Sequence, residues 1–128
     1  MKTNWVKPSP SIRLIMDAVL YGGFIALFFL ELTGVGLHQW MGLAGAALAL
    51  CHLIVHWDWV TSVTERFFVR LPWQARLYYL VDMPLLAGFA LMVLSGLAIS
   101  TWFDLPLSAG WTTFHITISK ISLGLIVF

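Results

Sequence analysis

Charged residues are scarce in this sequence. Asp, Glu, Lys and Arg make up 10% of its 128 residues, whereas 60% are hydrophobic and the mean hydropathy is +0.90. A soluble domain carries about 25% charged residues, because its surface faces water. The scarcity therefore excludes an ordinary soluble domain and predicts that lipid surrounds the chain. The formal net charge of +1 gives no indication of a nucleic-acid partner.

Cysteine is almost absent as well. The one cysteine, Cys51, lies in an apolar stretch, so a disulfide framework within one chain is excluded. The Cys-x-x-Cys-His motif that attaches haem covalently is also missing, and any haem must be held by coordination alone. The sequence shows no nucleophile–base set, phosphate-binding loop or hydrolytic carboxylate pair. We therefore expect the protein itself to carry out no bond chemistry.

Long apolar stretches dominate the rest of the chain. Four of them, at residues 12–32, 38–59, 77–100 and 111–128, approach or exceed the roughly 20 residues that a membrane-spanning helix needs. The first stretch lacks a small-x-small cleavage pattern, so we interpret it as a retained helix and not as a signal peptide. Short loops make neighbouring helices antiparallel. The sequence thus predicts an all-α, up-down-up-down transmembrane four-helix bundle that forms a single membrane domain over residues 1–128.

Basic residues lie on one side of this predicted bundle. Six of the seven precede the first helix or separate the second from the third: Lys2, Lys7, Arg13, Arg66, Arg70 and Arg76. Because Lys and Arg are enriched in cytoplasmic loops, we expect a cytoplasmic N-terminus, in a bacterial inner membrane. The loops at 34–37 and 101–110 are then outside. Segment 61–76 either lies flat on the inner interface or forms an ordinary loop.

The histidines belong to the second and fourth predicted helices, which run in the same direction. His38 opens the second helix and His115 lies four residues into the fourth, so both imidazoles should lie at a similar depth near the outer side. Polar side chains are costly in a membrane and tend to mark functional sites there. Two imidazoles that face each other provide the axial ligands of a haem. The alternative for a single histidine near a helix end is an interfacial, hydrogen-bonded role.

Spacing along the second helix predicts a second haem site. His52 follows His38 by 14 residues, which is just under four turns and about 21 Å along one face. His56, four residues further on, shares that face, and two such histidines cannot bind opposite faces of one haem. We therefore favour His52 as the ligand, with His56 bonded to a propionate.

Other residues allow two interpretations. Lys120, five residues beyond His115, either extends toward the outer surface or pairs with a haem propionate or a quinone oxygen. Asp17 is expected to pair locally with Arg13, one turn earlier, in preference to forming a proton path. Small residues between His38 and His52 either admit a flat macrocycle or permit close helix packing. They are Gly42, Ala44, Gly45, Ala46, Ala47 and Ala49.

These motifs together resemble a known family. The stretch from His38 to Leu43, the segment Cys51-His52-Leu-Ile-Val-His56-Trp57-Asp-Trp59, Leu94-Ser95-Gly96, and Trp111 with His115 are similar to flavinylation-associated cytochromes, which are b-type, dihaem-like four-helix membrane proteins. The resemblance covers nearly the whole chain. It implies electron transfer across the membrane toward proteins that carry covalent flavin. It also implies an outer haem on His38 and His115 and an inner haem on His52, with His56 beside it.

The resemblance also implies a further histidine in the inner half of the fourth helix. The position 14 residues beyond His115 is the one just after Phe128, where the sequence ends. We therefore expect a truncated fourth helix and a chain that completes only one bis-histidine site.

Three functional hypotheses follow. The first is a haem b cytochrome that carries electrons between a quinol or other donor and a redox partner, such as a flavinylated protein. The second is a b-type membrane anchor subunit of a larger quinone-linked oxidoreductase. The third is a non-redox metal-binding membrane protein, whose histidines should converge within a few ångströms and not repeat along one face.

Overall fold

The computed structural model describes residues 8–69, 71–103 and 105–127, and this part of the chain is helical with no strand. The predicted all-α class is thus confirmed. The described ranges contain five helices: α1 (Pro10–Phe28), α2 (Leu30–Val55), α3 (Trp57–Arg66), α4 (Trp73–Ala98) and α5 (Ala109–Val127). Lys2, Lys7, Arg70 and Phe128, which entered the predictions of orientation and of the fourth helix, lie outside the described residues.

The connection between α1 and α2 is tighter than predicted. α1 begins at Pro10, where the Ser9 side chain accepts a hydrogen bond from the backbone N–H of Ile12. α2 already starts at Leu30, and its only non-helical residue is Gly34, with φ 66° and ψ 165°. A glycine adopts a positive φ without steric cost, so the chain bends here and then continues as a helix. The predicted loop at 34–37 was therefore wrong, and His38 lies inside α2 and not at its start.

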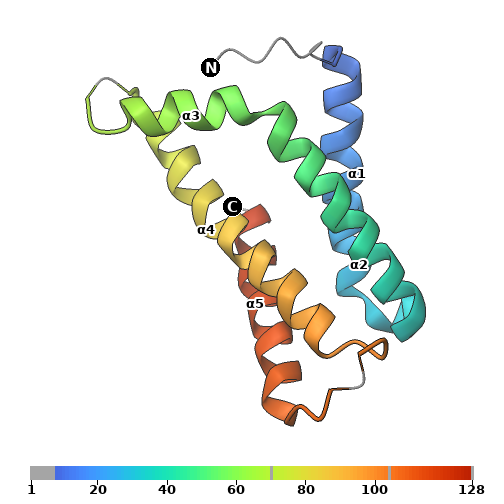
Figure 1. The fold of residues 1–128 in the computed structure, drawn as a ribbon. Coiled ribbons are helices and arrows are strands. Elements are labelled where there is room, and N and C mark those ends of the chain that lie inside the picture. Colours follow the sequence, from blue (N-terminus) through green and yellow to red (C-terminus); the bar gives the residue numbers. More distant parts are fainter. Residues whose placement is uncertain (1–7, 70, 104, 128) are drawn as a thin grey trace.

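The second predicted helix also ends earlier than expected. α2 stops at Val55, and His56 has φ −98° and ψ 7° before α3 begins. The apolar run ends there, and α3 carries polar residues on one side and buries Val63 on the other. Figure 1 shows α3 crossing from the end of α2 to the start of α4. The first part of segment 61–76 is therefore helical and not an ordinary loop.

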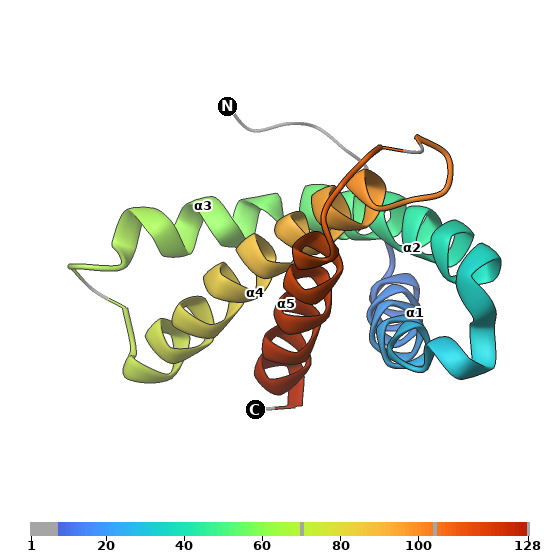
Figure 2. The ribbon, with the colours of Figure 1, turned by 90° about the horizontal axis from the view of Figure 1, so that it is seen from below.

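The four longer helices form two antiparallel hairpins. α1 packs along α2, and α4 packs along α5, whereas α2 touches α4 much less (Figures 1 and 2). Small residues bring α4 and α5 close together. A Cβ at Gly88 would lie only 2.6 Å from Oγ of Ser122, so a larger residue at this position would have to displace that side chain. Ser122 is fully buried there.

The hairpins meet at the end where α2 begins. Thr101, which follows α4, donates a hydrogen bond of 3.0 Å to the side-chain oxygen of Gln39. The rings of Trp40 and Trp102 lie 5.2 Å apart at the same place. At the opposite end, α3 spans the distance between the hairpins. The two hairpins are thus joined directly at one end and by α3 at the other.

Three described helices, α1, α2 and α4, are long and apolar enough to cross a membrane. Their large side chains point outward to an unusual extent, with exposed fractions of 70% for Leu14 and 62% for Leu50. Val63 is the one buried hydrophobic residue in the described part of the chain. This surface suits lipid and not water. The fourth predicted span corresponds to α5, which carries His115, Lys120 and several hydroxyl groups and is not among these three helices.

Candidate functional site

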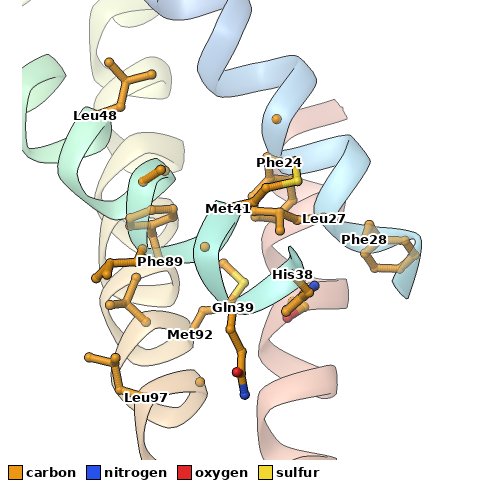
Figure 3. A pocket seen from close by; sticks show the side chains of 18 of the residues that line it. Phe24, Leu27, Phe28, His38, Gln39, Met41, Leu48, Phe89, Met92 and Leu97 are labelled. Carbon is orange, nitrogen blue, oxygen red and sulfur yellow. The ribbon is translucent and has the colours of Figure 1, made fainter. Parts of the chain in front are cut away.

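A cavity lies between the two hairpins. Its volume is about 330 Å³, within the usual range of ligand pockets, and its wall is almost entirely apolar. Figure 3 shows that helices α1, α2 and α4 contribute Phe24, His38 and Met92, respectively. The lining side chains include two histidines and four other polar groups, namely His38, His115, Gln39, Ser100, Ser119 and the indole of Trp102.

His38 and His115 face each other at this cavity. Their ring centres lie 6.3 Å apart and their planes are inclined by 75°. His38 belongs to α2 and His115 to α5, and Figure 1 shows that these helices run in the same direction. Two imidazoles bound to opposite sides of one metal ion, each at a nitrogen–metal distance of about 2 Å, have ring centres roughly 6 Å apart. The two rings are therefore spaced as an axial pair would be.

His115 is held by its neighbours on α4. Its Nδ1 lies 3.0 Å from Oγ of Ser95, and the Ser95 hydroxyl is directed at the carbonyl of Met92, 3.1 Å away. Because that hydroxyl proton is already used, Nδ1 of His115 donates to Ser95, which leaves Nε2 unprotonated. A metal-binding histidine normally has this arrangement. Gly96 makes room for the ring, since a Cβ there would lie 3.0 Å from Cε1 of His115.

His38 has an unsatisfied ring nitrogen. Its Nδ1 is buried and has no hydrogen-bond partner in the structure. The residue after it, Gln39, anchors this part of α2 to Thr101 of the other hairpin. An imidazole nitrogen that is withdrawn from water without a partner is costly, by about 1–3 kcal/mol. The position thus favours a ligand or an ordered partner at this ring.

Glycines of α1 and α2 open the cavity wall. Gly23, Gly42 and Gly45 line it, and an added Cβ at any of the three would meet no atom within 4 Å. Close helix packing would instead place atoms against these positions, as it does at Gly88. Of the two interpretations of the small residues in the second helix, the structure favours space for a ligand at Gly42 and Gly45.

His52 and His56 lie elsewhere, toward the other end of the α1–α2 hairpin. Neither lines the cavity. Their rings are 4.5 Å apart, and Nδ1 of His52 is 2.9 Å from Oδ1 of Asp17, an ion-pair distance without hydrogen-bond alignment. The expected pairing of Asp17 with Arg13 was wrong, because Asp17 contacts His52 across the hairpin and Nε of Arg13 donates to the carbonyl of Pro8.

His56 sits at the break between α2 and α3. Burial lowers the pKa of His56, and the neighbouring His52 lowers it further, while Asp17 acts in the opposite direction. The imidazole is therefore neutral near pH 7 and can act as a ligand. Lys120, which was proposed to contact a cofactor, is exposed on α5 and is not part of the cavity wall.

Comparison of the chain with known proteins adds no match. Neither protein-family models, nor curated proteins, nor solved structures give one. The resemblance to flavinylation-associated cytochromes therefore rests on the sequence motifs alone.

Two partners of the histidines were not predicted from the sequence. Ser95, which bonds His115, appeared there only as part of a family-like motif. Asp17, which contacts His52, was paired within its own helix. A depth count places Asp17 and His52 at a similar depth, five and seven residues from the inner ends of the predicted helices 12–32 and 38–59, but it does not show that the two side chains face each other.

Proposed function

We propose that this chain is a haem b membrane cytochrome that carries electrons between a quinol or other donor and a redox partner. The observation that supports it most is the pair His38 and His115, which face each other across 6.3 Å at an apolar cavity. The two imidazoles come from different hairpins, as axial ligands of a haem within a helical bundle often do.

The residues present fit a haem in four respects. The separation of the rings suits two bonds to one iron, and Nε2 of His115 is left free by the hydrogen bond to Ser95. Nδ1 of His38 is buried without a partner. Gly42 and Gly45 leave open space along α2, where a flat macrocycle can approach the backbone. His38 and His115 would therefore hold the group.

Haem bound at this site supplies reversible one-electron exchange at its iron. The protein contributes the rest. Ser95 fixes the orientation of His115 and increases its basicity through the Nδ1–H bond. Apolar walls exclude water, and together with the ligand type they set the reduction potential. Phe24, Phe89 and Met92 belong to this wall.

The proposal includes a membrane arrangement. The two hairpins form a transmembrane four-helix bundle in a bacterial inner membrane, with α5 as the fourth span. The basic residues Arg13, Arg66 and Arg76 favour a cytoplasmic position for the N-terminus, which puts His38 and His115 near the outer face. Electrons then leave toward a flavin-bearing partner or reach a quinone at the membrane surface.

Spectroscopy of ligand variants tests the proposal. The purified chain should show a low-spin haem with two imidazole ligands in its oxidised and dithionite-reduced spectra. His38→Ala and His115→Ala should each abolish that same component. Leu37→Ala and Ile116→Ala are matched controls, because they alter exposed neighbours of the two ligands. If the two histidine variants removed different components, or none, the proposed pairing would be wrong.

A further inference from the structure

Three potential metal ligands converge away from the cavity. Asp17 of α1, His52 of α2 and His56, which follows α2, each offer one atom, and these atoms all lie within 4.8 Å of one another. The closest pair is Oδ1 of Asp17 and Nδ1 of His52, at 2.9 Å. Two ligands bonded at about 2.0–2.2 Å to one tetrahedral ion lie about 3.3–3.6 Å apart, so this pair needs to open by only about 0.5 Å to hold such an ion.

The local backbone explains this convergence. His52 and His56 are four residues apart, and the backbone N–H of His56 still donates to the carbonyl of His52 at 3.0 Å. The helical spacing thus persists up to His56 and puts both rings on one face, 4.5 Å apart. Two histidines at this spacing on a helix are a recurrent zinc-binding arrangement. Asp17 faces them from the antiparallel helix α1.

The ring nitrogens at this place lack hydrogen bonds. Nε2 of His56 and Nδ1 of His52 are both buried, and neither has a hydrogen-bond partner in the structure. A buried polar atom without a partner costs about 1–3 kcal/mol. Nδ1 of His52 has only the ion-pair contact with Asp17, and Nε2 of His56 has no polar partner, so a cation between the three side chains would satisfy all of them at once.

His52 and His56 cannot ligate one haem between them. They lie on the same side of the chain, with their rings 4.5 Å apart, whereas the two axial ligands of a haem approach it from opposite faces. The other two histidines, His38 and His115, face each other at the cavity.

We propose that Asp17, His52 and His56 bind one divalent transition-metal ion, of which Zn²⁺ is the representative. Two imidazoles and a carboxylate suit zinc or ferrous iron, and three protein ligands leave further coordination positions open. The bound ion joins α1 to the end of α2 next to α3. This proposal gives His52 a different role from the inner haem ligation that the family resemblance implies.

Zinc retention by the purified chain tests the proposal. The protein in detergent is stripped with a chelator, incubated with Zn²⁺, dialysed and analysed for metal and for haem. The unaltered chain should retain one zinc per chain. Loss of a residue that only hydrogen-bonds to a metal ligand typically lowers metal affinity by about 10–100-fold. Asp17→Asn, His52→Gln and His56→Gln each remove a direct ligand, so each should lower the zinc affinity by at least that factor.

Controls separate this site from the cavity and from misfolding. Glu31→Gln removes a carboxylate at the other end of the same hairpin and should leave zinc retention unchanged. His115→Gln should alter the haem spectrum and leave the zinc in place. Circular dichroism must show that each variant keeps its helices. No stoichiometric zinc in the unaltered chain, or equal retention in the three ligand variants, would overturn the proposal. A low-spin haem signal that disappears in His52→Gln would overturn it as well.

Discussion

Removal of the Ser95 hydroxyl should weaken haem binding without touching a ligand. Ser95 is only 2% exposed, and its Oγ accepts the Nδ1–H of His115 at 3.0 Å. In Ser95→Ala no water can replace the lost acceptor at so buried a position. A buried Nδ1–H of His115 without an acceptor costs about 1–3 kcal/mol of free energy. Since about 1.4 kcal/mol corresponds to a tenfold change, the loss in haem affinity should be about 5- to 150-fold.

The same α4–α5 interface provides a matched control. Ser122 is 1% exposed, and its Oγ is buried without a hydrogen-bond partner. Ser122→Ala therefore removes a buried hydroxyl of the same size that holds no histidine, and haem affinity should stay within about twofold of the unaltered chain.

Haem titration of the apoprotein in detergent, followed at the Soret band, measures both variants. The midpoint potential gives a second test. Without the hydrogen bond to Ser95, His115 is a weaker electron donor to iron. The reduced form of the haem is then stabilised relative to the oxidised form, so the midpoint potential should rise in Ser95→Ala. Equal affinities and equal potentials for the two serine variants would refute the proposed role of Ser95.

Two further predictions concern orientation and packing. A reporter fused at Ser108 should lie outside the membrane and one at Thr64 inside, because the basic residues favour a cytoplasmic N-terminus. Gly88→Ala should lower the free energy of unfolding by about 1–3 kcal/mol in a denaturant titration, since its Cβ would lie 2.6 Å from Oγ of Ser122.

Each of these has an outcome that contradicts it. Inverted reporter signals would reverse the topology and exchange the outer and inner sites. For packing, Gly124→Ala is the control, because a Cβ there meets no atom within 4 Å and alanine favours the helix by up to about 1 kcal/mol. If Gly88→Ala were as stable as Gly124→Ala, the close approach of α4 and α5 would be wrong.

Counting residues along helices predicted the relation between His38 and His115. Depth in a bundle depends on a regular rise per residue and on the alternation of direction, and both follow from apolar stretches and short loops. The structure brings the two rings together at 6.3 Å although the start of α2 was misplaced by several residues. The error was small in effect because Gly34 bends the chain before His38 and leaves the helix beyond it intact.

Contacts across helices could not be predicted in the same way. The sequence places Arg13 one turn from Asp17 and so suggested a pair within one helix. The rotation of α1 against α2, which decides that Asp17 faces His52, depends on side-chain packing along the whole hairpin. The end of α2 at Val55 is a local break with φ −98° at His56, and no proline or glycine marks it. These two features produce the cluster with His56, which the 14-residue spacing did not indicate.

The junction between the hairpins has a consequence for biogenesis. The cavity has one wall on each hairpin, and direct contacts such as Gln39 with Thr101 join them at a single end. Each hairpin can therefore enter the bilayer as an independent insertion unit, and docking forms the cavity afterward. A ligand that bridges His38 and His115 binds only the docked state and stabilises it by mass action. Under the proposed function, haem would be such a ligand and its supply would control assembly, so in a haem-starved cell we expect two inserted hairpins that have not yet closed.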